Sequence, residues 1–164
     1  MKFDITKVAN VILYMLEKNV LHLNDKKLAT MLFLIEYNHL RTYSEKVFGE
    51  EYIKGKRNPE PKILGDIFDI IANSKDLDEE DDRLYIIQEL LDHLDIEVLT
   101  KANYIELQFI KMEEEFDKTL FSTKEMKTIN SIIEDYLEDT PRKVANATFK
   151  NEKVREANLG DVII

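Results

Sequence analysis

One stretch, Lys27 to Pro61, constrains the fold of this chain more than any other: KLATMLFLIEYNHLRTYSEKVFGEEYIKGKRNPEP. Its first part predicts a helix over residues 25–41, because apolar residues recur there at three- and four-residue spacing. That face comprises Leu28, Met31, Leu32, Ile35 and His39, and the apolar surface is widened almost all round by Phe33, Leu34, Tyr37 and Leu40. A helix of this kind lies at the centre of a domain, since other elements must cover each apolar side.

Beyond residue 41 the helical spacing stops, and residues typical of strands appear between Gly49 and Gly55 and just before them. We expect a short irregular strand or hairpin around residues 47–54. The sequence Asn58-Pro59-Glu60-Pro61 excludes a helix at that point. It favours Pro61 as the first position of a helix that runs to Ala72.

Local hydrogen-bonding signals mark the starts of other helices. Asp4 and Asn24 are predicted to cap the first two, Ser122 and Glu125 form a capping box, and Thr140-Pro141 opens a further helix. Residues 83–111 are open to two interpretations: a helix followed by an antiparallel pair of strands, or a region in which one of those later segments is also helical. These patterns predict a mainly α fold, a compact bundle of about five to seven helices with a small β-hairpin or a short two- to three-stranded sheet.

The length of 164 residues predicts one domain over residues 1–164. Residues 74–82 hold acidic side chains that repel one another, so we expect a solvated loop there. The formal net charge of −10 opposes binding to nucleic acid through phosphate contacts and suits a basic protein partner. The apolar stretch near the N-terminus is too short and too polar to span a membrane, and we expect a soluble protein of the cytoplasm.

Residue patterns that carry catalysis or bind metals are lacking in the sequence. With no cysteine there is no disulfide framework, thiolate metal site or cysteine nucleophile. The three histidines have no spacing that would make a metal site on a helix, and none of the four glycines belongs to a phosphate-binding loop. No serine lies in a nucleophile-elbow pattern. We therefore expect no enzyme activity, metal or cofactor.

A basic and aromatic cluster follows the central helix and consists of Lys54, Lys56 and Arg57, with Tyr43 and Tyr52 nearby. Tyrosine and arginine are enriched at the energetic centres of protein interfaces, which favours a protein-binding patch. A solvated turn without a binding role is the alternative interpretation.

Taken in order, several segments resemble the SocA-like antitoxin family, which is built on the Panacea domain. They are KVANVILYMLEKN near the start, the central helix with its Leu32-Phe33-Leu34, GEEYIK at residues 49–54, the turn at residues 58–61, LFSxxE at residues 120–125, and the closing stretch from Ala147-Thr148 to Gly160-Asp161-Val162-Ile163. Three positions depart from the family pattern. Asn58 stands for a turn glycine, Thr148 or a neighbour for a histidine, and Val154 or a neighbour for a tryptophan.

The resemblance implies an antitoxin that neutralises a cognate toxin protein by direct binding, in a toxin–antitoxin, phage or mobile-element context. A variant within the family delivers the toxin to a protease such as a Clp-type machine. We expect the binding surface at the end of the central helix, in the segment 43–61 and at the C-terminal turn, with these candidate residues: Tyr37, His39, Arg41, Tyr43, Tyr52, Lys54, Lys56, Arg57, Asn58, Pro59 and Thr148. His39 also suits a buried structural role. The alternative function is a phage or mobile-element protein that binds DNA or regulates transcription.

Overall fold

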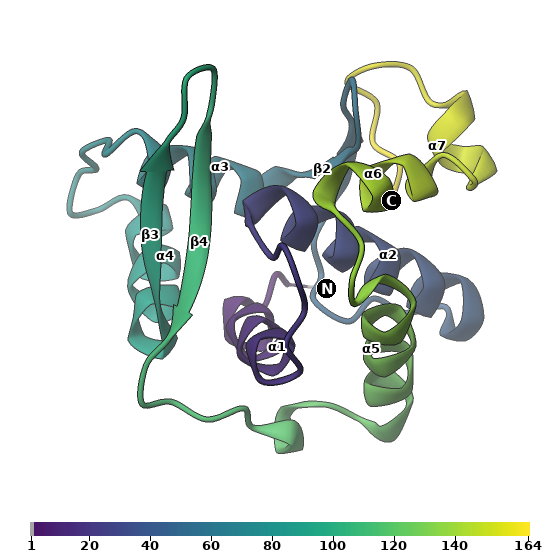
Figure 1. The fold of residues 1–164 in the computed structure, drawn as a ribbon, viewed down its shortest axis with the longest axis horizontal. Coiled ribbons are helices and arrows are strands. Elements are labelled where there is room, and N and C mark those ends of the chain that lie inside the picture. Colours follow the sequence, from purple (N-terminus) through teal and green to yellow (C-terminus); the bar gives the residue numbers. More distant parts are fainter. Residues whose placement is uncertain (1) are drawn as a thin grey trace.

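A computed structural model describes residues 2–164, which form seven α-helices, one 3-10 helix and two small antiparallel sheets (Figure 1). The helices are α1 Ile5–Glu17, α2 Asp25–Tyr43, α3 Lys62–Ala72, α4 Asp82–His93, the 3-10 helix η1 Lys118–Leu120, α5 Thr123–Tyr136, α6 Pro141–Thr148 and α7 Glu152–Glu156. The strands are β1 Tyr52–Lys54, β2 Pro59–Pro61, β3 Leu94–Thr100 and β4 Ile105–Lys111. The predicted mainly α fold class is confirmed, although α7 was not predicted.

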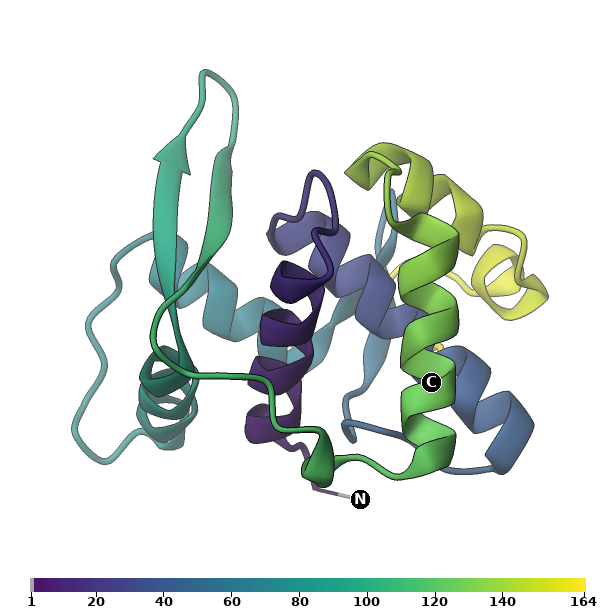
Figure 2. The same cartoon turned by 60° about the horizontal axis from the view of Figure 1, so that its bottom comes forward.

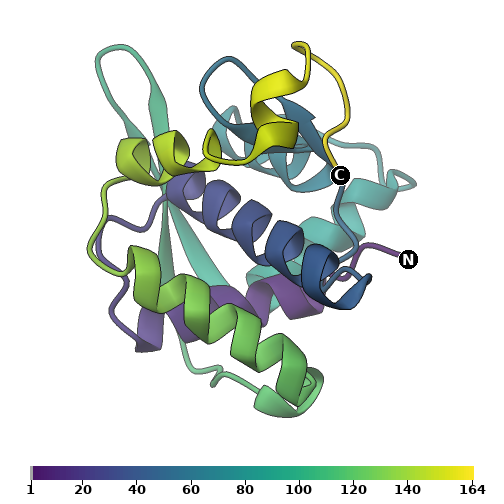
Figure 3. The same ribbon diagram turned by 90° about the vertical axis from the view of Figure 1, so that its right-hand side faces the viewer.

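Helix α2 lies at the centre, as its all-round apolar surface predicts. Every residue from 27 to 36 is buried. Helix α5 covers one side of α2 and helix α6 another, and β2, α3 and β4 contact it as well (Figure 3). The helix runs two residues past the predicted end, because Ser44 adopts a left-handed conformation with φ of 61° and its N–H bonds to the Leu40 carbonyl.

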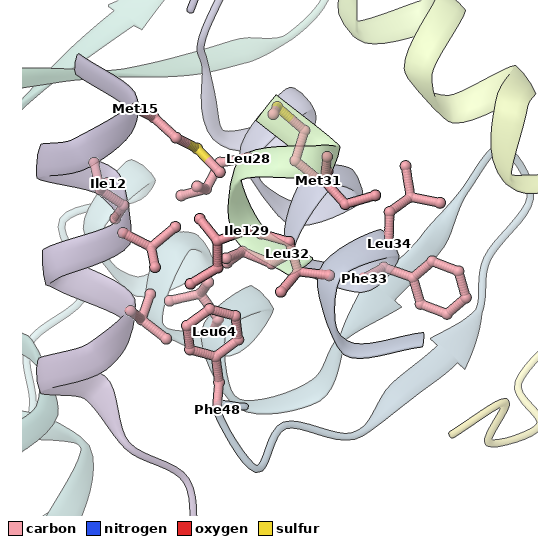
Figure 4. Close-up of a cluster of buried hydrophobic side chains, with 14 of the residues drawn as sticks. Ile12, Met15, Leu28, Met31, Leu32, Phe33, Leu34, Phe48, Leu64 and Ile129 are labelled. Atoms are coloured by element: carbon pink, nitrogen blue, oxygen red, sulfur yellow. The ribbon is translucent and has the colours of Figure 1, made fainter. Parts of the chain in front are cut away.

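The apolar core joins the centre of the molecule to its surrounding elements (Figure 4). Ile12 of α1, Leu32 of α2, Phe48 of the following loop, Leu64 of α3 and Ile129 of α5 are all less than 2 % exposed. Burying one large aliphatic side chain stabilises a fold by about 1.5–3 kcal/mol. Apolar contacts of this kind therefore hold α1, α3, α5 and the loop after α2 against the central helix.

The predicted starts of α1, α2 and α5 are confirmed by their hydrogen bonds, whereas α3 starts at Lys62 and not at Pro61, because Pro61 is extended and ends β2. Asp4 accepts from the Lys7 N–H, and Asn24 accepts from the Lys27 N–H at 2.8 Å. Ser122 and Glu125 form the expected reciprocal capping box at the start of α5. Each such cap is typically worth about 1 kcal/mol, because it satisfies an amide that the helix leaves without a partner.

Both sheets are hairpins. In the first, Tyr52 pairs with Pro61 and Lys54 with Pro59. In the second, seven residue pairs run from Leu94↔Lys111 to Thr100↔Ile105, which resolves residues 83–111 as a helix followed by a hairpin. The β3–β4 hairpin projects beyond the helices (Figure 2). No helix within residues 2–164 has the length and apolar character to cross a membrane.

Candidate partner-binding groove

An open groove of about 1430 Å³ lies between the two hairpins. Residues 56–58, the turn of the β1–β2 hairpin, border it on one side together with the start of α6, and residues 104–106 of the β3–β4 hairpin border it on the other. Helix α3 and the first turn of α2 complete its lining. Figure 1 shows the two hairpins rising on either side of this region. The groove thus collects segments that are far apart in the sequence.

The β1–β2 turn is shaped by a close backbone approach. The Gly55 N–H donates to the Asn58 carbonyl at 3.2 Å, and a Cβ atom on residue 55 would lie 2.7 Å from that same oxygen. Only glycine leaves room for such an approach. The Asn58 side-chain amide donates to the Pro59 carbonyl at 2.9 Å, and Lys56 and Arg57 are left exposed. Asn58 therefore supports the turn through its side chain.

Two buried carboxylates hold the chain between α2 and α3. Glu36 accepts hydrogen bonds from the backbone N–H groups of Val47, Phe48 and Glu50 at 2.5–3.1 Å. The Glu50 carboxylate in turn accepts from the N–H of Leu64 at 2.8 Å and caps the start of α3. Burial raises the pKa of both Glu36 and Glu50, while their backbone donors lower it. The base of the β1–β2 hairpin is thus fixed from inside the protein.

The C-terminal residues fix the outer edge of β1. The Tyr52 N–H donates to the Ile164 carbonyl at 2.9 Å, and the Ile163 N–H donates to the Tyr52 carbonyl at 2.7 Å. Two further backbone bonds join Lys54 to Gly160 and Asp161. The Lys54 ammonium donates to the Val154 carbonyl. The closing Gly-Asp-aliphatic stretch, on which part of the family resemblance rests, therefore acts as an additional strand along β1.

The opposite wall is tied to the start of α2. The Leu107 N–H of β4 donates to the Asp25 carboxylate at 3.1 Å, and the Asn24 side-chain amide donates to Glu106 at 2.8 Å. Nearer the tip, the Lys26 ammonium lies 4.8 Å from the centre of the Tyr104 ring, whose residue is 50 % exposed. This wall is therefore tied to α2 through the tip-side half of β4, and an exposed aromatic side chain lies next to these ties.

The charge lining the groove differs from that of the whole chain, which carries −10. Its basic side chains are Lys26, Lys56, Arg57, Lys62 and Arg142, and its acidic ones are Asp25, Glu60, Asp66, Asp69 and Glu106, so their formal charges cancel. Residues outside the groove pair with some of them: Arg83 with Asp66 at 2.9 Å, Lys75 with Asp69 at 2.6 Å and Glu51 with Lys62 at 3.4 Å. Within residues 2–164, Lys26, Lys56, Arg57 and Arg142 have no ion pair.

The residues predicted to bind a partner fall into separate places. Lys56, Arg57 and Asn58 line the groove. Tyr37, Arg41 and Tyr43 belong to the C-terminal half of α2, where the Arg41 guanidinium lies 5.8 Å from the Tyr37 ring centre and Lys124 lies 5.3 Å from that of Tyr43. Figures 1 and 3 both show this end of α2 well apart from the β1–β2 turn.

Four of the candidate residues are buried: His39, Tyr52, Pro59 and Thr148. Their side chains do not reach the surface, so the predicted contact with a partner is corrected to a structural role. Tyr52 is only 1 % exposed, because β1 turns this ring inward, where it packs edge-on against Phe33 at 5.3 Å. Lys54 is half-buried and bonded to a backbone carbonyl. The segment 43–61 is accordingly accessible only in part, and Lys56 and Arg57 are the exposed basic residues of its turn.

His39, one of the candidate partner-binding residues, has a structural role instead. Its Nδ1 lies 2.9 Å from the Thr128 hydroxyl of α5, whereas its Nε2 has no hydrogen-bond partner among the described residues. The nearest carboxylate to Nε2 is that of the exposed Glu45, at 3.9 Å. Burial lowers the pKa of His39 and favours the neutral ring.

Sequence reasoning missed the groove residues that come from other segments, notably Lys26, Tyr104 and Arg142. Nothing local marks them, because they meet only through the tertiary fold. It also missed the buried Lys27, whose ammonium donates to the carbonyls of Leu21 and Asp139 at 2.6 Å each. Here a signal existed, since an isolated Lys or Glu inside an almost wholly apolar helix must be satisfied by partners.

The described part of the chain, residues 2–164, brings no three histidine or carboxylate side chains together in a way that could hold a metal ion. Searches of curated proteins and of solved structures found no match to this chain. A family model described as antitoxin SocA-like, Panacea domain, matches residues 27–153, from the start of α2 into α7. The match includes both hairpins, α3, α6 and α2 from residue 27, whereas groove residues 24–26, helix α1 and the closing residues 154–164 lie outside it. The chain therefore belongs to the SocA-like antitoxin family and carries its Panacea domain.

Proposed function

We propose that this protein is an antitoxin that neutralises a cognate toxin protein by direct binding, with the groove between the two hairpins as the binding surface. Membership of the SocA-like antitoxin family supports an antitoxin role. The observation that carries the proposal is the groove itself, which exposes aromatic and basic side chains on a rigid base. Such side chains are enriched where protein interfaces bind most strongly.

The size of the groove favours a polypeptide over a small molecule. Pockets for small ligands have volumes of about 300–1,000 Å³ and enclose most of the ligand. This groove has about 1430 Å³ and lies open at the surface, between hairpin turns and helix ends. Residues presented on loops by a firm scaffold commonly carry binding function.

Co-expression tests the proposal. The product of the neighbouring gene is expressed alone and together with this protein, and cell growth is measured. We expect growth arrest by that product alone and recovery when this protein is present. A harmless product, or arrest that persists when both proteins are made, would contradict the proposal.

The level of the toxin distinguishes two modes of neutralisation. Binding that occludes the toxin leaves its amount unchanged, whereas delivery to a Clp-type protease lowers it. Immunoblots of the co-expressing cells, with and without the protease, measure this difference. Pull-down of the two purified proteins shows whether neutralisation requires direct contact.

A further inference from the structure

We infer that the segment bound in the groove is acidic, with apolar side chains between its carboxylates. This inference rests on the proposed function, because it names the part of the partner protein that the groove recognises. Within residues 2–164 the groove has four cations without an ion pair against three such carboxylates, so the excess there is one positive charge, in a protein whose total charge is −10. A partner carboxylate can approach here, while it is repelled by much of the remaining surface.

The basic side chains of the groove are available to a partner. Lys56, Arg57 and Arg142 are exposed, come from two elements and form no ion pair within residues 2–164. Most acidic side chains of the groove are already engaged. Asp66 and Asp69 pair with cations outside it. The remaining three consist of Glu60 and two carboxylates that accept hydrogen bonds from the protein, Asp25 from the Leu107 amide and Glu106 from Asn24.

The apolar lining supplies the second part of the specificity. Tyr104 is exposed and Phe149 is half-buried along the groove between the charged groups, whereas Phe68 and Pro61 are buried in its floor. Phe68 packs against Phe109 at 5.7 Å, so the floor is held in place by the β3–β4 hairpin. An acidic segment without apolar side chains would leave this surface uncovered. A segment with both kinds of side chain would bury the apolar area and satisfy the free cations.

Long-range and local charge then act on different parts of the partner. The net charge of −10 draws a basic protein towards this one, whereas the groove selects an acidic segment within it. The net charge of the whole protein and the local charge of the groove have opposite signs, and together they fix the orientation of the partner in the complex. They also disfavour a uniformly basic or a uniformly acidic partner.

A peptide titration tests the inference without the toxin. The probe is a short peptide in which Phe and Leu lie between glutamates, labelled with a neutral dye, and its counterpart has lysines in place of the glutamates. The groove variant is Lys56→Glu/Arg57→Glu/Arg142→Glu. The control variant Lys127→Glu/Lys150→Glu/Lys153→Glu has the same net charge and changes exposed lysines that do not line the groove. Thermal unfolding verifies that both variants are folded.

We expect the acidic peptide to bind the unchanged protein and the control variant alike, and to bind the groove variant at least about tenfold more weakly. The affinity falls as salt is added, and the lysine peptide does not bind. Failure of the acidic peptide to bind, or equal binding by both variants, would overturn the inference. So would self-association that the groove variant abolishes, because the occupant would then be a second copy of this chain.

The same variants in the co-expression assay separate this inference from the proposed function. If the unchanged protein fails to neutralise the toxin, the proposed function falls, while the peptide titration still reports on the groove. If the unchanged protein neutralises the toxin and the groove variant does so equally well, the antitoxin role stands and the inference is overturned. Loss of neutralisation in the groove variant alone supports both.

Discussion

The two hairpins that border the groove are held in different ways. The β1–β2 hairpin has strands of three residues each, yet the buried carboxylates of Glu36 and Glu50 fix its base and residues 160–164 cover its outer edge. The β3–β4 hairpin has strands of seven residues, and its base is packed while residues 100–104 at its tip are exposed. The short hairpin is thus held at its base and along its outer edge, and its turn is exposed. The long hairpin is held to α2 through Glu106 and Leu107 of β4, and its turn is exposed as well.

The largest effect is expected when the anchor of the short hairpin is removed. Glu36→Gln keeps the shape of the side chain but replaces one acceptor oxygen with a donor that faces a backbone N–H. Hydrogen bonds to a charged group are worth about 1.5–3 kcal/mol, so we expect a loss of about 4 kcal/mol in the free energy of unfolding. Denaturant titration measures it. The exposed Glu51→Gln is the control and should change stability by less than about 0.5 kcal/mol; a similar small change for Glu36→Gln would remove the distinction between the hairpins.

The buried part of β4 in the long hairpin is the next test. Leu107 is fully buried, and Leu107→Ala leaves a cavity in the core, which we expect to cost about 3 kcal/mol. Tyr104→Ala, in the exposed turn just before β4, should cost less than about 0.5 kcal/mol. Thermal and denaturant unfolding of both variants gives the comparison. If the two substitutions cost the same, the hairpin is not divided into packed strand positions and a free turn.

A smaller effect is expected at the segment that covers β1. Gly160 has φ of +88°, a conformation that other residues adopt only with strain, although a Cβ atom there would meet no neighbour. Gly160→Ala should therefore destabilise the protein by about 1 kcal/mol through its backbone alone. Hydrogen exchange should show faster exchange at Tyr52 and Lys54, whose amides bond to this segment. Unchanged exchange at both amides would show that the segment does not hold the hairpin.

The dependence of stability on pH tests the region just before the short hairpin, where His39 is buried between α2 and α5. Burial lowers its pKa below 6.5, so the unfolded chain binds a proton more readily than the folded one. Its contribution to stability is present above pH 6.5 and is lost as the pH falls through the folded-state pKa. Nearby Glu125 and Glu45 raise this pKa, and Lys7 and Lys124 lower it.

His39→Gln should remove that part of the pH dependence. Unfolding curves of both proteins at a series of pH values between 7 and 5 give the difference directly. Glu36 and Glu50 titrate in the opposite sense, because their raised pKa values give stability that is lost as the pH rises above their usual range. Their contribution is common to both proteins and cancels in the comparison. Identical slopes for the two proteins would contradict a neutral, buried His39.

The sequence allowed prediction of much of the fold, because many of its determinants are local. The caps at Asn24 and Ser122 and the spacing of apolar residues in α2 act within a few residues of the chain. The groove could be predicted only at residues 56–58. Its other parts, around residues 26, 104 and 142, meet through tertiary packing that no local pattern encodes. The sequence does not reveal that Tyr52 is buried, because a strand of three residues is too short for alternation to show its inner face.

The backbone ladder between β1 and residues 160–164 has a consequence for handling the protein. Without those residues, the amides of Tyr52 and Lys54 and their carbonyls would form an open strand edge beside the apolar rings of the core. Open edges of this kind pair readily with strands of other molecules. Truncation at residue 159 should therefore promote aggregation, or exchange of the missing strand between neighbouring chains.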